Sequence, residues 1–377
     1  MGDRLRVAHI ITRLNVGGAA GFVLDVCRLL PGDAFEPVVV SGHEPECEGS
    51  LEVGFADAGV RVIRLRGLRR SPLPHVDLWA AREIVRVLRE LRPDVVHTHM
   101  TKAGLLGRWA AVRLGLPAVH HIHGWAFRGE PAPLRPAYLA LERLGARWCR
   151  HLLAVSQADV DRGLALRIGR PEQYRIVHAG IDVAATAEQA RRPDEELSAL
   201  RATHRLVGFI GRLCRQKDPL TFISAAARVE RARPGACRFV LVGEGPLAST
   251  VDREAVRAGL GDTLVRYPLR DDVPRLLGAL DVLVHPSRHE GLPRMLLEAA
   301  AAGVPCVATA VDGCGELFAG PLAGVSVPPG DPEATASAIL EVLDRGARSP
   351  NPAALAEYDI GRAVEELERA YRDLLHM

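Results

Sequence analysis

Two glutamates with seven residues between them are the side chains best suited to chemistry in this sequence. Glu290 follows an apolar run that predicts a strand, and Glu298 lies about two turns into a helix expected to begin near Gly291. Backbone amides at a helix start point toward a bound ligand. Carboxylates accept hydrogen bonds from sugar hydroxyls, so the pair indicates a sugar site. One helix-start acid and one surface acid would give the same spacing.

Two cations flank the turn that follows the apolar run Leu206–Ile210. Arg212 lies directly after the run, and Lys217 precedes the next expected helix. Fixed cations on such a turn can hold a diphosphate and stabilise it as a leaving group. Two solvated surface charges would produce the same pattern, so these residues alone leave both interpretations open.

Glycines mark two further turns between a strand and a helix. Gly18 lies in the segment 15–21 after the first expected strand, and Gly243 begins a Gly-Glu-Gly-Pro turn after a later one. Glycine lets backbone N–H groups approach a phosphate closely at a helix start. The first segment has Val16 where a dinucleotide fingerprint needs glycine, and no G-K-[ST] follows, so neither a Rossmann fingerprint nor a P-loop is indicated. A structural role fits these glycines equally well.

Histidines gather at the ends of two neighbouring expected strands, at positions 97, 99, 120, 121 and 123. Alternation along a strand places His97 and His99 on one face, and His121 and His123 on one face. A metal site, a set of hydrogen-bonded structural histidines and a histidine at a reacting centre are all open. No carboxylate or cysteine accompanies them at ligand spacing. His123 is the best candidate for a reacting centre because it ends its strand.

The elements that must position these residues alternate along the whole chain. Short β-branched runs separated by helical patterns predict parallel sheets flanked by helices. The expected strands of the first half are Val7–Thr12, Glu36–Ser41, Val60–Leu65, Asp94–His99, Ala118–His123 and Leu152–Ser156. Those of the second half are Leu206–Ile210, Arg238–Val242, Leu264–Tyr267, Val282–His285, Cys306–Thr309 and Gly324–Val327. Expected helices include Asp77–Leu91 and Ala103–Leu114.

Two series of strands predict two α/β domains. Gly180–Asp182 is the expected exit from the first, and the polar stretch Ala187–Thr203, which has no clear apolar period, separates the series. The last helix, Ile360–Leu375, has a core-facing apolar spacing and could pack on either domain. Two such domains would form a cleft between the carboxyl ends of both sheets, where open α/β folds bind ligands.

Composition supports a water-soluble protein of two domains. The chain has 377 residues, 48% of them hydrophobic, and a formal net charge of +2, which gives no indication of a nucleic-acid partner. Its seven cysteines include no C-x-x-C pair, so neither a zinc site nor a disulfide framework is indicated. The sequence shows no cleavable signal pattern and no spanning apolar stretch, so we expect a cytoplasmic location.

Together these motifs resemble the family-4 retaining glycosyltransferases of the GT-B fold, over essentially the whole chain. The motifs are Gly17-Gly18-Ala19, Val96-His97-Thr98-His99, His123-Gly124, Gly180-Ile181-Asp182, Gly211-Arg212 with Gln216-Lys217, Gly243-Glu244-Gly245, Glu290 with Glu298, and Asp312–Leu317. The resemblance implies two Rossmann-like domains facing across a cleft, with the last helix returning to the first. Residues 1–180 and 358–377 would form the acceptor-binding domain, and 181–357 the donor-binding domain.

The resemblance also implies a role for each candidate residue. Those expected at the reacting centre are His123, Arg212, Lys217 and Glu290. Those expected to bind a nucleotide-sugar donor are Gly18, Gly243, Leu269, Gly291, Leu292, Pro293 and Glu298, and those expected near the acceptor are His99, Lys102 and Trp125. Arg212 and Lys217 would replace a metal, so no metal or other cofactor is expected. Asp159 and Asp161 form a D-x-D triplet, but they follow Ser156 at a helix start, where capping explains them.

Retention in this family is described as front-face attack, in which the acceptor hydroxyl loses its proton to the departing phosphate. The resemblance favours a UDP-sugar, with UDP-N-acetylglucosamine preferred, and bacterial members that build surface polysaccharides or natural products. Asp312 replaces a common family glycine, which would place an acid in the donor pocket. The acceptor is expected to be a small molecule or a lipid-linked sugar. A nucleotide-sugar 2-epimerase of the same fold and a non-catalytic nucleotide-sugar-binding protein are the alternatives.

Membrane contact is expected to be peripheral at most. Arg64, Arg66, Arg69 and Arg70 form a basic loop that could meet a phosphate-bearing acceptor or an anionic membrane, although a solvated run is the simpler explanation. A monomer or a homodimer is expected.

Overall fold

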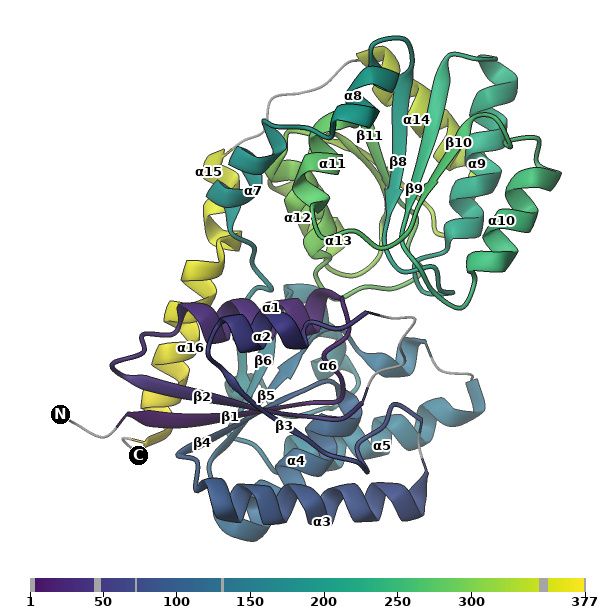
Figure 1. The fold of residues 1–377 in the computed structure, drawn as a ribbon. Coiled ribbons are helices and arrows are strands. Elements are labelled where there is room, and N and C mark those ends of the chain that lie inside the picture. The colour runs from purple at the N-terminus through teal and green to yellow at the C-terminus, as the bar shows by residue number, and fades with distance from the viewer. Residues whose placement is uncertain (1–3, 44–48, 72, 130–131, 346–351, 376–377) are drawn as a thin grey trace. The chain divides into compact units, whose positions relative to one another are not determined.

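The computed structural model describes residues 4–43, 49–71, 73–129, 132–345 and 352–375. The chain divides into two compact units (Figure 1). Unit 1 consists of Met1–Ala179 and Ile360–Met377, and unit 2 consists of Gly180–Asp359.

Unit 1 is built on a parallel sheet with seven strands among the described residues, in the order β3-β2-β1-β4-β5-β6-β7. The strands are β1 (Leu5–Ile11), β2 (Phe35–Ser41), β3 (Arg61–Arg64), β4 (Val95–His99), β5 (Ala118–Ile122), β6 (His151–Ala154) and β7 (Tyr174–Ile176). The sequence did not predict β7, because this strand has only three residues, none of them fully buried, and they form no apolar run. The other six lie within two residues of their predicted bounds.

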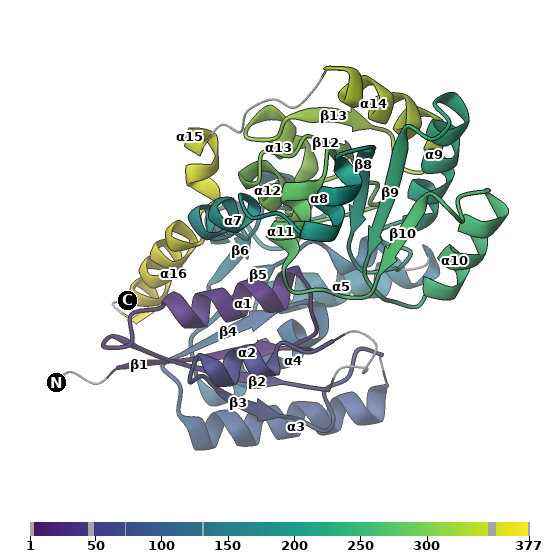
Figure 2. The ribbon, with the colours of Figure 1, turned by 45° about the horizontal axis from the view of Figure 1, so that its top comes forward.

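Helices cover both faces of this sheet. They are α1 (Gly18–Leu29), α2 (Glu52–Asp57), α3 (Pro74–Leu91), α4 (Thr101–Leu114), α5 (Arg135–Ala146), α6 (Gln157–Ala165) and α16 (Ile360–Leu375). Short 3-10 helices span Ala126–Arg128, Ala132–Leu134 and Pro171–Gln173. α1 and α16 lie side by side over one face, whereas α3 and α4 pack together on the other (Figure 2).

The last helix, α16, belongs to unit 1 although nearly half of the chain separates it from the rest. The Tyr371 hydroxyl lies 2.6 Å from Nδ1 of His97 on β4, and Arg175 pairs with Asp373 at 2.8 Å. Val364, Leu367 and Tyr371 form its buried stripe. α16 therefore completes the cover over the central strands of the first sheet.

Unit 2 contains a parallel sheet with six strands among the described residues, in the order β10-β9-β8-β11-β12-β13. The strands are β8 (Arg205–Ile210), β9 (Cys237–Val242), β10 (Leu264–Tyr267), β11 (Val282–His285), β12 (Cys306–Thr309) and β13 (Gly324–Val327). Each was predicted to within one residue, because each is a short apolar run bounded by turn residues.

The helices of unit 2 form two layers. They are α7 (Val183–Ala190), α8 (Glu195–Arg201), α9 (Pro219–Ala232), α10 (Ala248–Arg257), α11 (Val273–Ala279), α12 (Arg294–Ala301), α13 (Cys314–Ala319), α14 (Pro332–Arg345) and α15 (Pro352–Leu355), with a 3-10 helix at Ala356–Tyr358. α9 packs against α10 and α14, and α7 packs against α11 and α12.

The polar stretch Ala187–Thr203 is largely helical, although its lack of an apolar period gave no indication of a helix. It holds the end of α7 and all of α8. Asp182 caps α7 by accepting from the Ala185 N–H at 2.8 Å, and Asp194 caps α8 by accepting from the Leu197 N–H at 3.0 Å. The capping aspartate at each helix start is therefore the sequence feature that indicates these helices, since both are too short to show an apolar helical period.

The turn after β9 requires glycine at position 243. Its φ is 136°, and a Cβ there would lie 2.1 Å from the Gly211 carbonyl oxygen. Gly243→Ala is expected to lower the free energy of unfolding by about 3 kcal/mol, because both the dihedral and the close contact oppose a side chain. Chemical denaturation followed by circular dichroism measures this. Gly261→Ala is the control, since its Cβ would meet nothing within 4 Å, and an equal loss there would contradict the explanation.

Candidate active site

Lys217 and Glu290 meet in unit 2, at the carboxyl ends of β8 and β11. Lys217 Nζ lies 2.6 Å from Glu290 Oε1. The Glu290 side chain is 8% exposed and that of Lys217 is 24% exposed, so the carboxylate lies inside while the ammonium keeps a face toward solvent. The pair therefore presents a cation of fixed position to any anion that binds here.

The charge state of Glu290 is set by its neighbours. Burial alone would raise the pKa of this carboxyl, but the Lys217 ammonium and hydrogen bonds from His285 and Lys217 outweigh it and hold the pKa well below the usual value of 4.5. A carboxyl whose pKa is depressed by folding stabilises the fold above its unfolded pKa and loses this contribution only as the pH falls below it. Glu290 is thus ionised throughout the neutral range.

His285 is a member of this cluster that the sequence did not single out. Its Nε2 lies 3.1 Å from Glu290 Oε1 and 3.1 Å from the Ser287 hydroxyl. Burial, followed by the nearby Lys217 charge, lowers the pKa of His285, so the ring is neutral. An ionised carboxylate can only accept, so the proton must be on Nε2. His285 lies at the end of its strand, five residues before Glu290, and that spacing is the signal that could have identified it.

Asp312 supports the backbone of Glu290. Its Oδ2 accepts a hydrogen bond from the Glu290 N–H at 3.0 Å. The Asp312 carboxylate therefore helps to fix the position of Glu290. The φ of 46° at Asp312 lies in the left-handed region, where aspartate is tolerated better than most residues. Glycine would adopt the same conformation without strain.

The segment after Glu290 is not yet helical. α12 begins at Arg294, later than the predicted start near Gly291, and Pro293 is its N-cap residue. Glu298 is thus about one turn into the helix rather than two, and it is half-buried. Gly291, Leu292 and Pro293 are buried, and the Gly291 carbonyl accepts from the Gly313 N–H at 3.0 Å. The glutamate pair and the 312–317 segment are therefore one connected structure.

The remaining predicted donor residues of unit 2 lie on neighbouring turns. Arg212 is half-buried and follows Gly211, whose N–H bonds to the Val242 carbonyl at 3.0 Å. This bond brings Arg212 and Gly243 to adjacent strand ends. Leu269 is 42% exposed and lies beyond β10, the edge strand of the sheet.

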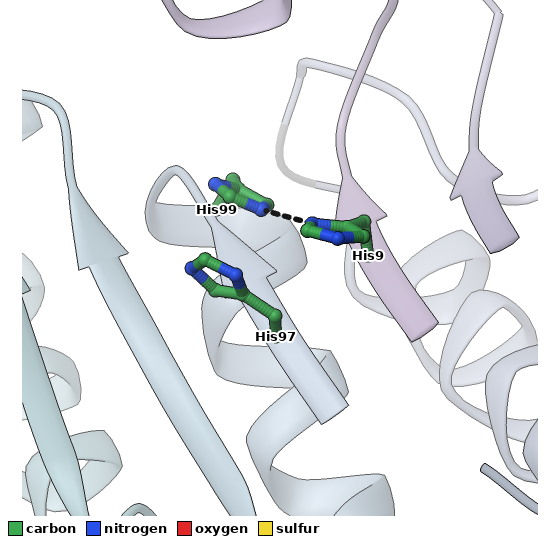
Figure 3. Close-up of side chains that lie close together, drawn as sticks. All are labelled: His9, His97 and His99. Carbon is green, nitrogen blue, oxygen red and sulfur yellow. Dashed lines mark hydrogen bonds between the residues drawn. The ribbon is translucent and has the colours of Figure 1, made fainter. Parts of the chain in front are cut away.

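Five histidines of unit 1 form one stack on a single face of its sheet. His9 on β1 is paired in register with His97 on β4, and His99 is paired with His121 on β5. The rings of His121 and His123 are 4.6 Å apart and nearly parallel. Phe22 of α1 contacts both of these rings edge-on, so Gly18, one turn earlier in α1, lies toward the same end of the sheet. Figure 3 shows His9, His97 and His99.

Three of these rings are joined in a chain that ends at His123. His9 Nδ1 lies 3.1 Å from His99 Nε2, and His99 Nδ1 lies 3.1 Å from His123 Nε2. Burial lowers the pKa of His9 to about 3, and burial followed by neighbouring histidines lowers the pKa of His99 well below its ordinary value. Both rings are therefore neutral, and each contact is a single N–H donated to a ring nitrogen.

The three residues predicted near the acceptor differ in their burial and in their bonding partners. His99 is fully buried within the stack. Trp125 is 4% exposed, and its Nε1 donates to the Asp159 carbonyl at 2.9 Å, so it packs in the core and the prediction of an acceptor contact is corrected. Lys102 bonds Asp77 at 2.6 Å and remains partly accessible. In the D-x-D triplet, Ser156 caps α6 by accepting from the Asp159 N–H at 3.2 Å, as capping predicts.

The chain has two parallel-sheet α/β units, which is the architecture of the GT-B class of glycosyltransferases. One unit carries a Lys–Glu–His cluster, and the other carries a histidine at a strand end. Comparison with known proteins agrees. Residues 16–185 match the family described as Glycosyltransferase Family 4, and residues 204–345 match Glycosyl transferases group 1. The chain belongs to the family-4 glycosyltransferases, and the predicted fold class is confirmed.

Individual relatives cover nearly the whole chain. A UDP-Gal:alpha-D-GlcNAc-diphosphoundecaprenol alpha-1,3-galactosyltransferase of Escherichia coli is 27% identical over 91% of this chain and 89% of its own. A D-inositol 3-phosphate glycosyltransferase of Mycobacteroides abscessus is 30% identical over 88% and 78%. The crystal structure of Anabaena HepE with UDP and glucose aligns with a TM-score of 0.78 at 19% identity, covering 98% of this chain and all of that one. The chain is therefore a glycosyltransferase.

Among the helices that the structure describes, none is both long and apolar enough to cross a membrane.

Proposed function

We propose that this enzyme transfers a hexosyl or N-acetylhexosaminyl group from a UDP-sugar to a hydroxyl, with retention of configuration and without a catalytic metal. The observation that carries the proposal is the partly exposed Lys217 ammonium held 2.6 Å from the buried Glu290 carboxylate. A diphosphate leaving group needs positive charge at a fixed position, and this pair supplies it without a bound ion.

In this mechanism unit 2 binds the donor. Lys217 and Arg212 contact the diphosphate and stabilise the charge that develops as the glycosidic bond breaks. Glu290, fixed by Asp312, accepts hydrogen bonds from the sugar hydroxyls, and Glu298 accepts them from the ribose. The acceptor hydroxyl attacks the anomeric carbon on the face that the diphosphate leaves, and its proton passes to the departing phosphate oxygen. No protein nucleophile is required, so the contribution of the enzyme is positioning and charge stabilisation.

In unit 1 we propose that His123 contacts the donor hexose near the reacting carbon. The chain His9–His99–His123 holds this ring in one orientation. His9 Nε2 is buried without a hydrogen-bond partner, and an unpaired lone pair costs less there than an unpaired N–H. The favoured arrangement is therefore donation from His9 to His99 and from His99 to His123 Nε2. His123 then carries its own proton on Nδ1.

UDP-N-acetylglucosamine is the first donor to test, and UDP-galactose, named in the Escherichia coli relative, is the second. That relative also names a diphosphoundecaprenol-linked sugar, which supports a lipid-linked acceptor, whereas the Mycobacteroides abscessus relative names an inositol phosphate. Thermal shift with UDP-, GDP- and dTDP-sugars tests the donor, because a ligand at 100 times its Kd adds about 2.7 kcal/mol of stability. Stabilisation by GDP-sugars alone would contradict the proposed base.

A lipid-linked acceptor requires contact with a membrane surface, and unit 1 has a groove suited to it. The groove is lined by Arg64, Arg66, Trp79, Arg82, Glu83 and Arg86. Leu78 and Trp79, on the same helix α3, are 50% and 44% exposed. Exposed arginines beside exposed apolar side chains are typical of peripheral binding to anionic lipid.

Arg82→Glu/Arg86→Glu is expected to reduce binding to phosphatidylglycerol vesicles by at least about tenfold, because each basic side chain near such a surface contributes about 1 kcal/mol. Vesicle sedimentation measures the change. Arg253→Glu, an exposed residue on α10 of unit 2, is the charge-matched control for one substitution. Equal binding of the double variant and the wild-type protein, or equal binding to neutral and anionic vesicles, would rule this surface out.

A further inference from the structure

Three buried nitrogens in the histidine stack have no hydrogen-bond partner. They are Nε2 of His9, Nε2 of His97 and Nδ1 of His121. A buried polar atom without a partner is destabilising, and a cluster of such atoms in one place needs an explanation such as a bound ion or water. The proposed transfer mechanism uses His9 Nε2 only to set the direction of the hydrogen-bond chain, and it gives no role to His97 Nε2 or His121 Nδ1.

Three of the rings are arranged as ligands around one point. His9, His97 and His99 each offer one nitrogen, and these three atoms lie within 4.8 Å of one another (Figure 3). Nδ1 of His9 and Nε2 of His99 are 3.1 Å apart. Two nitrogens bound tetrahedrally to one zinc ion at about 2.1 Å are separated by roughly 3.4 Å. Small rotations of the rings would thus bring all three to coordination distance.

The opposite nitrogens of two of these rings already have partners. His97 Nδ1 lies 2.6 Å from the Tyr371 hydroxyl, and His99 Nδ1 lies 3.1 Å from His123 Nε2. Histidines that bind a metal characteristically donate their other ring N–H to such a partner, which fixes the tautomer and the ring orientation. Nε2 is consequently the ligand atom of both rings, and in His99 the ion would replace the contact with His9 Nδ1. His9 would offer Nδ1 after its proton moves to Nε2, or Nε2 after its ring turns over.

We propose that His9, His97 and His99 bind a single zinc ion on the covered face of the first sheet. Three neutral imidazoles suit a borderline divalent transition ion, whereas Mg²⁺ and Ca²⁺ require oxygen ligands that this set lacks. A fourth position would be filled by water.

The ion would have a structural role that is compatible with transfer without a catalytic metal. All three ligands are 0% exposed, so the ion would exchange slowly and would not meet substrate. Coordination through Nε2 would place the proton of His99 on Nδ1, directed at His123. It would therefore fix the same orientation of His123 that the buried hydrogen-bond chain favours. Zinc binding at this position would not depend on which sugar the enzyme transfers.

The test is metal content. The wild-type protein is refolded with zinc, dialysed against a chelator and analysed by mass spectrometry, and about one equivalent per chain is expected. His97→Asn is expected to reduce this to below about a tenth. His120→Asn is the matched buried control, because His120 bonds Thr98 and belongs to neither ligand set, and it should retain the ion. His9→Asn serves if His97→Asn does not fold. Tetrahedral Co²⁺ absorption in the wild-type protein provides an independent readout.

Two outcomes would overturn the proposal. One is wild-type protein that holds no zinc and gives no tetrahedral Co²⁺ spectrum, in which case the nitrogens are accommodated by water alone. The other concerns the alternative set His99, His121 and His123, which meets the same distance limit. Loss of the ion in His121→Asn but not in His97→Asn would place the site at His99, His121 and His123 and contradict the proposed ligands.

Discussion

Replacing Lys217 with alanine is expected to lower kcat by roughly 10²- to 10³-fold, the usual effect of removing one group that stabilises charge in a transition state. The ammonium is the cation that Glu290 holds in place, and it keeps a solvent-facing surface for the diphosphate. Steady-state assays of UDP release from the donor measure the effect. Arg215→Ala is the control, since Arg215 is an exposed cation on the same turn and should leave kcat unchanged.

The same substitution also removes the charge that keeps the pKa of Glu290 low, so it is expected to destabilise unit 2. The double variant Lys217→Ala/Glu290→Gln separates the two effects. Without a buried carboxylate to leave unpaired, it should recover stability relative to Lys217→Ala but recover no activity. If activity returned together with stability, Lys217 would have a structural role only, and its assignment to the diphosphate would be wrong.

Replacing His123 with alanine is expected to lower kcat by a similar factor of roughly 10²–10³. His123 lies beyond the end of β5 and is half-buried, and the proposed contact is with the donor hexose. The Kd for UDP, measured by calorimetry, should change less than about twofold, because the nucleotide is assigned to unit 2. Loss of the stacking contacts with His121 and Phe22 should cost about 1 kcal/mol of stability.

His75→Ala is the control for this prediction, since His75 is an exposed histidine on α3 of the same unit. It should match the wild-type enzyme in kcat and stability. A His123→Ala enzyme with full kcat would remove the histidine from the reaction. Weakened UDP binding with unchanged kcat would instead show that His123 contacts the nucleotide rather than the hexose.

The fold was largely predictable because the strands of unit 2 are short apolar runs between turn residues. Val282–His285 and Cys306–Thr309 coincide with their predicted bounds. The alternation rule also placed His97 and His99 on the same face, where the structure has them stacked. Periodicity failed at α8, whose start is marked by the Asp194 cap and whose length is too short for a pattern.

The candidate site was less predictable, because its contacts join residues that are distant in sequence or set by backbone geometry. The pairing of Lys217 with Glu290 spans 73 residues, so the sequence could suggest each residue but not their contact. The hydrogen bond between Asp312 and the Glu290 backbone depends on a left-handed φ at Asp312, which the sequence did not indicate. Trp125 was expected near the acceptor, but its indole N–H donates to the Asp159 carbonyl in the core. His9 entered the stack only through the register of β1 with β4.

The most direct test of the account is the configuration of the sugar released from an α-linked UDP-sugar in the presence of EDTA. Wild-type enzyme without acceptor should slowly release UDP, and proton NMR at early times should show the α-anomer before mutarotation, at a rate that EDTA does not change. Initial release of the β-anomer would contradict retention, and loss of activity in EDTA that Mg²⁺ or Mn²⁺ restores would contradict the assignment of the diphosphate to Lys217 and Arg212. Epimerisation of the donor at C2 would instead support the nucleotide-sugar 2-epimerase alternative.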